Sequence, residues 1–220
     1  MILTPTRELA MQVAEHAREL AKNTHLDIAT ITGGVAYMNH MEVFSENQDI
    51  VVATTGRLLQ YIKEENFDCH AVETLILDEA DRMLDMGFSD DIMQIVKYLP
   101  KERQTIMFSA TMPRKIQDLA RTILHDPVEV KLAVSKPADK IVQSAYVCYE
   151  AQKVSLVKKL FAERPPHRVI VFASSKLKVK DMAIALGRAG FKVGAMHSDL
   201  EQQERLFRIF VCSKKILVSM

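Results

Sequence analysis

The sequence has few cysteines, no long apolar run and no histidine pattern typical of a metal site. Its three cysteines, Cys69, Cys148 and Cys212, are far apart and form no paired metal-binding spacing, so we expect reduced thiols. No apolar run is long enough to cross a bilayer, and the first residues lack the charged start and apolar stretch of a signal peptide. The seven histidines include no H-E-x-x-H pattern. These absences argue against a secreted or membrane protein and favour a cytoplasmic one without a histidine-bound metal.

Charge is distributed unevenly along the chain, although the net charge is only +1. Residues 1–133 hold 13 basic and 21 acidic side chains, a balance of −8. Residues 142–220 hold 14 basic and 6 acidic side chains, a balance of +8. This asymmetry predicts two domains with different electrostatic roles, and an apolar content of 48% supplies enough material for their cores. The basic half could face phosphate groups, although most of its lysines are taken individually as solvated surface residues.

Short apolar runs alternate with amphipathic stretches in both halves. This pattern is typical of βαβ units, with a parallel sheet and sites at the carboxyl ends of the strands. We therefore predict an α/β fold with residues 1–133 as a first domain, 134–141 as a polar linker and 142–220 as a second domain. The expected strands are 2–3, 28–31, 49–53, 74–77, 104–108, 169–172, 193–196 and 216–218, and the alternation resumes after the linker with 142–149. The expected helices are 8–21, 54–63, 88–98, 113–124, 153–161 and 178–189.

A cluster of carboxylates follows the expected strand at 74–77. Asp78, Glu79 and Asp81 stand within four positions, directly after three branched apolar residues. Acids at the carboxyl end of a buried strand can hold a divalent cation and poise a water molecule. A strand followed by an ordinary polar turn is the alternative interpretation of this segment alone.

Three further strand ends carry residues suited to phosphate. Pro5-Thr6-Arg7-Glu8-Leu9 stands where a strand gives way to a helix, so backbone N–H groups and an arginine gather there. Thr54-Thr55-Gly56-Arg57 repeats this arrangement with a capping threonine, and Gly33-Gly34 ends another strand. Each segment alone could be no more than a helix cap or a turn. Their recurrence at one sheet edge predicts a track for a nucleic-acid backbone.

Two hydroxyl residues follow the expected strand at 104–108. Ser109 and Thr111 flank Ala110 at the same predicted edge as the acids. Their hydroxyl groups can form hydrogen bonds with Asp81 and so report the state of a metal site. They could also cap the helix that follows Pro113.

Taken together, these segments resemble the DEAD-box ATP-dependent RNA helicases of superfamily 2, of bacterial type. The match rests on Pro5 to Leu9, Gly33-Gly34, Thr54-x-Gly56-Arg57, Asp78-Glu79-Ala80-Asp81, Ser109-Ala110-Thr111, Val171-Phe172 and Gln202-x-x-Arg205, in the order and approximate spacing of that family. The resemblance implies two RecA-like lobes with mostly parallel sheets, both incomplete in this chain. It also implies binding of ATP and Mg²⁺, and of single-stranded or short duplex RNA without dependence on sequence.

The resemblance further implies a role for each matching residue. Asp78 would hold Mg²⁺ through water, and Glu79 would orient and deprotonate the water that attacks the γ-phosphate. Asp81, Ser109 and Thr111 would couple the nucleotide state to RNA binding. The residues implied to bind RNA are Pro5, Thr6, Arg7, Gly34, Thr54, Gly56 and Arg57 in the first lobe and Phe172, Ser174, Gln202 and Arg205 in the second.

The sequence departs from the family pattern in several places. It contains no G-x-x-x-x-G-K-[ST] phosphate loop, no adenine-recognition segment and no later arginine-rich motif that supplies the finger for the γ-phosphate. Thr55 stands where the family usually has proline, and Ser198 where it often has glycine. We therefore expect a piece of a helicase, cut at both ends, with negligible ATP hydrolysis on its own. A non-catalytic RNA-binding module and an inactive remnant are the alternatives.

Overall fold

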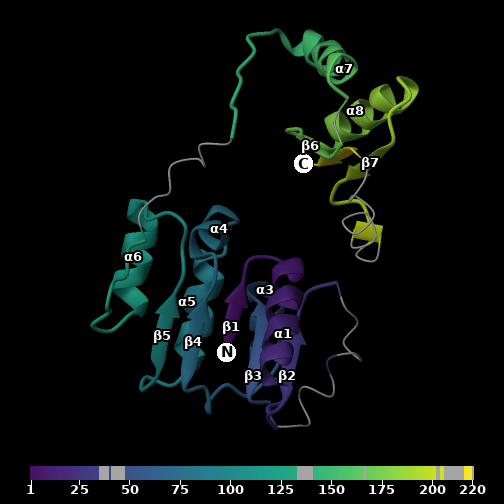
Figure 1. Ribbon diagram of the computed structural model, residues 1–220. Helices are drawn as coiled ribbons and strands as arrows, with labels where there is room; N and C mark the ends of the chain where they lie inside the picture. The colour runs from purple at the N-terminus through teal and green to yellow at the C-terminus, as the bar shows by residue number, and fades with distance from the viewer. Residues whose placement is uncertain are drawn as a thin grey trace. The chain divides into compact units, whose positions relative to one another are not determined.

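The computed structural model describes residues 1–34, 40, 48–132, 141–165, 167–201, 204–205 and 216–219. These residues form two compact units, Met1–Leu132 and Ala133–Met220, each of which is described by itself (Figure 1). No helix among the described residues is both long and apolar enough to cross a bilayer.

The first unit contains a five-stranded parallel sheet in the order β2-β3-β1-β4-β5 (Figure 1). Its strands are β1 (Ile2–Thr4), β2 (Ile28–Ile31), β3 (Ile50–Thr54), β4 (Thr74–Leu77) and β5 (Gln104–Met107). Its helices are α1 (Arg7–Ala21), α3 (Thr55–Lys63), α4 (Ala80–Asp85), α5 (Ser89–Tyr98) and α6 (Arg114–Ile123). The α/β class is thus confirmed. The six-residue helix α4 was not predicted.

The register of the sheet brings the strand ends level with one another. Leu3 of β1 is paired with Leu77 of β4, which is paired in turn with Met107 of β5. On the other side, Thr4 is paired with Thr54 at the end of β3. Because all these strands are parallel, the loops that follow them emerge at a single edge of the sheet.

Apolar side chains cover both faces of the first sheet. Ala10 and Ala14 of α1 form one buried cluster with Val52 of β3. A larger cluster joins the strands to α3, α4, α5 and α6, and it includes the fully buried Leu77 and Ile95. Each side chain of this kind contributes about 1.5–3 kcal/mol through burial. This core holds the strand ends in fixed positions.

The second unit contains a three-stranded parallel sheet in the order β6-β8-β7. Its strands are β6 (Val169–Phe172), β7 (Val193–Met196) and β8 (Ile216–Ser219); its helices are the 3₁₀ turn η2 (Glu150–Gln152), α7 (Lys153–Glu163) and α8 (Lys176–Arg188). Val179 and Leu186 of α8 pack with Ile216 and Val218 of β8. Residues 142–149, where the alternation was expected to resume, form neither helix nor strand. Val142, Val147 and Tyr149 are largely exposed there, so no sheet face buries them.

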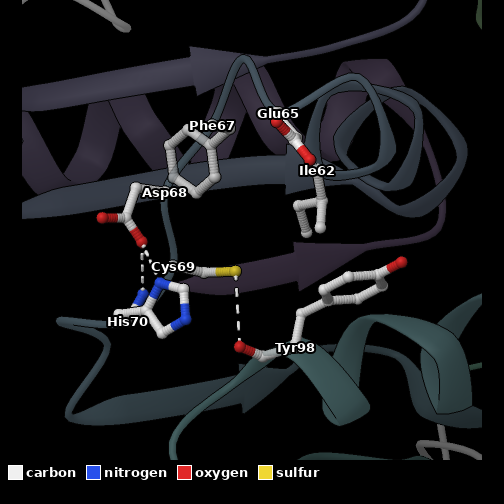
Figure 2. A pocket seen from close by; sticks show the side chains of 7 residues that line it. All are labelled: Ile62, Glu65, Phe67, Asp68, Cys69, His70 and Tyr98. Carbon is white, nitrogen blue, oxygen red and sulfur yellow. Dashed lines mark hydrogen bonds and ion pairs between the residues drawn. The ribbon is translucent and has the colours of Figure 1, made fainter.

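In the first unit, a cavity of about 350 Å³ lies at the end of the sheet opposite the edge where the loops after the strands emerge. It is between the segment before β4 and the end of α5 (Figure 2). Cys69 lies in its wall and donates a hydrogen bond from Sγ to the carbonyl oxygen of Tyr98 at 3.7 Å. Burial raises the pKa of the Cys69 thiol, which favours its protonated form. Cys69 and Cys148 are free thiols, in agreement with the prediction, and Cys212 lies outside the described residues.

Candidate functional site

The acid cluster lies in a sharp turn between β4 and α4. Glu79 has φ 52° and ψ 50°, the left-handed conformation, and it directly precedes the first residue of α4. The N–H of Phe108 donates to the carbonyl oxygen of Leu77 at 2.8 Å, and the N–H of Ala80 donates to that of Phe108 at 2.9 Å. These two bonds fasten the turn to the end of β5. The acids and the hydroxyl residues are therefore neighbours at one edge, as predicted.

Asp81 is joined directly to Thr111. Its Oδ2 accepts one hydrogen bond from the Thr111 backbone N–H at 2.9 Å and another from Thr111 Oγ1 at 2.7 Å. Oδ1 accepts a third from the N–H of Arg82 at 3.0 Å. Burial alone would raise the pKa of Asp81, but the hydrogen bonds from Thr111 and Arg82 lower it below its ordinary value. Asp81 is thus held as a carboxylate.

The hydroxyl groups of Ser109 and Thr111 do not cap the helix that follows them. Ser109 Oγ donates to the carbonyl oxygen of Thr111 at 2.7 Å, which closes a small turn. Helix α6 begins at Arg114, and its N-cap is Pro113, which provides no side-chain cap. The alternative in which these two hydroxyl residues cap the next helix is therefore wrong.

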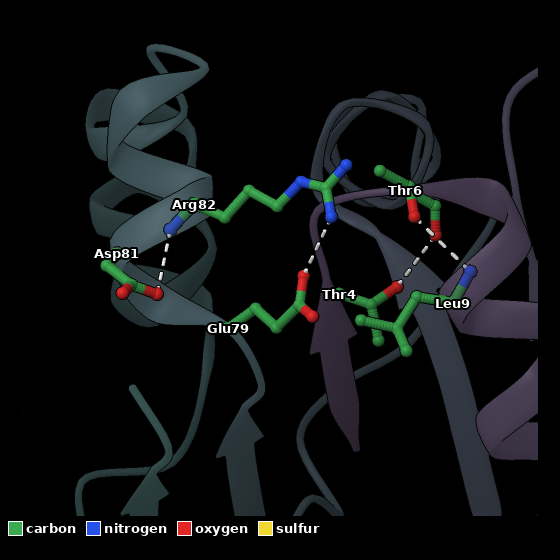
Figure 3. Close-up of polar contacts among 6 residues, drawn as sticks. All are labelled: Thr4, Thr6, Leu9, Glu79, Asp81 and Arg82. Atoms are coloured by element: carbon green, nitrogen blue, oxygen red, sulfur yellow. Dashed lines mark hydrogen bonds and ion pairs between the residues drawn. The ribbon is translucent and has the colours of Figure 1, made fainter. Parts of the chain in front are cut away.

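Asp78 and Glu79 have different surroundings from Asp81. Among the described residues, none donates a hydrogen bond to the Asp78 carboxylate, which is half-buried. Glu79 Oε2 lies 3.3 Å from Nη1 of Arg82, one helical turn away (Figure 3). Both side chains of that pair are substantially exposed, so the pair contributes little stability, but it does orient the Glu79 carboxylate. The sequence prediction overlooked Arg82, which the i, i+3 spacing from Glu79 could have indicated.

The segment after β1 forms the start of α1. Thr6 is the N-cap: its Oγ1 accepts from the N–H of Leu9 at 3.3 Å, while Thr4 Oγ1 donates to the Thr6 carbonyl oxygen at 3.1 Å (Figure 3). Pro5 is buried between them. The capping interpretation of this segment is confirmed, and it leaves the Arg7 side chain free to extend from the first turn.

Arg7 extends over the glycine pair that follows β2. Its guanidinium group lies so close to the backbone of Gly34 that a Cβ atom at this position would collide with it. Gly34 also has φ 72°, a conformation that glycine adopts without strain. The N–H of Gly33 donates to Thr54 Oγ1 at 3.3 Å, at the end of β3. Arg7, Gly34 and Thr54 therefore belong to one connected arrangement at the sheet edge.

The segment after β3 differs from the prediction in one respect. Thr54 is the N-cap residue of α3 by position, but its side chain does not cap the helix. It accepts the bond from Gly33 instead, so the predicted capping role of this threonine is wrong. Gly56 is exposed and Arg57 is half-buried in the first turn of α3. The basic residue of this junction thus lies at the same edge as Arg7.

The predicted residues of the second half lie in the second unit. Phe172 ends β6 and has 77% of its surface exposed, and Ser174 Oγ accepts from Lys178 Nζ at 3.2 Å. Arg205 is among the described residues, whereas Gln202 lies outside them. Asp199, which was not predicted, pairs with Lys176 at 2.6 Å and Lys180 at 3.1 Å. No pattern along the sequence marks that cluster, because its members come from separate segments.

The two parallel sheets, with loops of acids, hydroxyls and arginines at the carboxyl edge of the first, define a RecA-like α/β protein. The family model of the DEAD/DEAH box helicases matches residues 1–119. The chain belongs to this family.

Individual relatives agree with the family assignment. The chain is 57% identical over 210 residues to the ATP-dependent RNA helicase SrmB of Escherichia coli (strain K12), which covers 93% of this chain and 47% of the relative. It is 47% identical to SrmB of Haemophilus influenzae, with 93% and 47% covered. The chain thus spans about half the length of the curated relatives it matches.

Solved structures show the same fold. S. cerevisiae Dbp5 bound to RNA and ADP BeF3 matches with a TM-score of 0.80 and 25% identity, over 99% of this chain and 56% of that one. A DEAD box protein from Methanococcus jannaschii matches with a TM-score of 0.58 and 36% identity, over 99% and 60%.

Proposed function

We propose that this chain is part of an ATP-dependent RNA helicase that couples RNA-stimulated ATP hydrolysis to local unwinding of RNA duplexes. The observation that carries this proposal is the double hydrogen bond between Asp81 and Thr111. It connects the acid turn, which would serve the nucleotide, to the loop after β5. A change at the acids can therefore be transmitted to the neighbouring strand end.

Asp78 and Glu79 have different surroundings, and we assign them different roles. The Asp78 carboxylate accepts no hydrogen bond from the described residues, which fits a water-mediated contact to Mg²⁺, an ion that usually takes one or two protein carboxylates and keeps several waters. Bound Mg²⁺ would neutralise charge on the phosphates. Glu79, oriented by Arg82, would position the attacking water and accept its proton.

The other strand ends would hold the RNA backbone. In the first unit the proposed contacts are Pro5, Thr6, Arg7, Gly34, Thr54, Gly56 and Arg57; in the second they are Phe172, Ser174, Gln202 and Arg205. Arginines, backbone N–H groups and a helix N-terminus recognise phosphate rather than bases, so binding would be independent of sequence. Although residues 1–133 carry a balance of −8, the positive charge of Arg7 and Arg57 is concentrated where the backbone would lie. We place this activity in the cytoplasm.

The experiment is RNA-stimulated ATP hydrolysis by the 220-residue chain and by the chain extended with an upstream segment that carries the phosphate loop and a downstream segment that carries the arginine-rich motif. We expect negligible turnover from the chain alone, because much of the transition-state stabilisation comes from that loop. The extended chain should hydrolyse ATP, and Glu79→Gln should reduce its rate by at least about 100-fold. A melting curve for each polypeptide confirms folding.

The outcomes separate the alternatives. Turnover by the chain alone that Glu79→Gln abolishes would show that the phosphate loop is dispensable. A folded extended chain that binds RNA without hydrolysing ATP would favour the non-catalytic RNA-binding module.

A further inference from the structure

Arg57 packs against a buried aromatic ring on its own helix. Its guanidinium carbon lies 5.5 Å from the centre of the Tyr61 ring. The two residues are four positions apart in α3, and this spacing places side chains on the same face of a helix. A cation over an aromatic face is attracted by the ring quadrupole, so Tyr61 favours one direction of the arginine side chain.

Tyr61 is itself held by His40. The Tyr61 ring is fully buried, and its hydroxyl group lies 2.8 Å from Nδ1 of His40. The His40 ring meets the Tyr61 ring edge-on, with the centres 5.5 Å apart and the planes at 73°. His40 is 3% exposed. The tyrosine ring on which Arg57 rests is thus fixed by a hydrogen bond and by an aromatic contact.

The surroundings of His40 favour its neutral form, which does not repel the positive charge of Arg57. Burial lowers the pKa of His40, and the positive charge of Arg57 lowers it further. A neutral imidazole keeps one nitrogen as a hydrogen-bond acceptor and adds no second positive charge near the guanidinium group. The buried pair therefore supports Arg57 without repelling it.

We propose that Tyr61 and His40 are positioning residues for Arg57, and that they direct its guanidinium group toward a phosphate of bound RNA. The proposal rests on the proposed function, in which Arg57 contacts the RNA backbone. An arginine has a rigid fork of donors on a flexible stem, so a preset direction reduces the freedom lost when it engages a phosphate. Tyr61 and His40 would act on affinity through Arg57, without touching the RNA.

The test is a double-mutant cycle measured as the affinity of the 220-residue chain for a fluorescein-labelled, single-stranded oligouridine. We expect Arg57→Ala to weaken binding about tenfold and to lower the salt slope by about 0.7, the value for one phosphate contact to a single strand. Tyr61→Leu should weaken binding about three- to tenfold in the parent chain but have no further effect in the Arg57→Ala background. Tyr98→Leu, which removes a tyrosine from the same unit beside the cavity of Figure 2, should leave affinity unchanged.

More conservative substitutions test the proposal if Tyr61→Leu does not fold. Tyr61→Phe keeps the ring and removes the hydroxyl group, and His40→Ala removes its partner; each should weaken binding about twofold, again only when Arg57 is present. His40→Gln offers a new hydrogen-bonding group and should restore most of the affinity.

The outcomes distinguish this proposal from the one on which it rests. If Arg57→Ala leaves affinity unchanged, Arg57 is no RNA contact, and both proposals fail at this residue. If Arg57→Ala weakens binding while the changes at Tyr61 and His40 act equally in both backgrounds, the positioning role is wrong and the RNA contact stands.

Discussion

At the scale of single residues, the candidate site depends on a few side chains with specific neighbours. Arg7 lies against Gly34, Thr54 accepts a bond from Gly33, and Asp81 is saturated by Thr111 and Arg82. Apart from the bond from the neighbouring Arg82, each contact joins two strand ends that are far apart in the sequence. The edge of the sheet therefore behaves as a linked surface, where a change at one residue displaces a neighbour.

Gly34→Ala should impair RNA binding by displacing Arg7. The added Cβ would collide with the guanidinium group, and φ 72° is unfavourable for alanine, at a cost of about 1 kcal/mol in the free energy of unfolding. Because the guanidinium group is the end of a flexible side chain, it should move away, and we expect affinity for single-stranded RNA to fall several-fold. The measurements are an RNA titration and a chemical denaturation curve.

Gly33→Ala is the matched control for that change. A Cβ at Gly33 would lie 3.7 Å from Nε of Arg7, an ordinary contact. We expect binding and stability close to those of the parent chain. Equal losses from the two substitutions would contradict the role given to the backbone at Gly34.

At the scale of elements, the apolar pattern predicted the strands well because burial decides them. The run of apolar residues before Asp78 became β4, with Leu75 and Leu77 fully buried. Helix α4 escaped prediction because its first turn lies within the acid motif and follows the left-handed Glu79. Residues 142–149 are apolar enough to suggest order, but they form no strand and join no sheet, and Val142 and Val147 are exposed.

The sequence predicted at which edge of the sheet the site residues lie, but not which groups their side chains contact there. Spacing and strand order place the acids, the hydroxyl residues and the arginines together, because parallel strands end at one side. The bond from Gly33 to Thr54 and the contact of His40 with Tyr61 depend on how separate segments pack. Local propensity favoured Thr54 as a helix cap, but the neighbouring strand end provided its side chain with a different partner.

In the second unit, Glu150 links η2 to α7 and α8, and this link predicts a pH dependence. Ion pairs with Lys153 at 2.7 Å and Lys178 at 2.5 Å lower the pKa of Glu150 to about 2. Because its pKa in the folded state is below the ordinary value of 4.5, the stabilisation is complete above that value and is lost as pH falls through about 2. Carboxyl NMR should show a Glu150 titration midpoint at about 2.

Substitution of either lysine should move that midpoint upward. We expect Lys153→Ala and Lys178→Ala each to raise the pKa of Glu150 toward its ordinary value. Lys159→Ala provides the control, since Lys159 pairs with Glu163. An unchanged Glu150 midpoint in both test variants would show that these ion pairs do not persist in solution.

At the scale of the whole molecule, the chain divides into two compact units, one at Met1–Leu132 and one at Ala133–Met220. Each has its own parallel sheet and its own apolar core. Our sequence-based division, with a linker at 134–141, stays a prediction. It implies that a protease should separate the chain between the units before it cuts either core.

Limited trypsin digestion tests this division. Between residues 134 and 141 the candidate cleavage sites follow Lys136 and Lys140, and Pro137 blocks the first of them. We expect the earliest cut to follow Lys140 and to leave two fragments that mass spectrometry can identify. Lys140→Gln should delay that cut without changing the later ones. A first cut inside either sheet-bearing unit would contradict the predicted boundary.

The left-handed backbone at Glu79 limits how the thermal stability of the protein can be raised by substitution. A residue with a side chain is held in this conformation at a cost of about 1 kcal/mol. Glycine would relieve the strain but would remove the carboxylate to which we assign the attacking water. Selection for heat resistance and selection for turnover thus oppose each other at this one position, and thermostable variants must be sought at other sites.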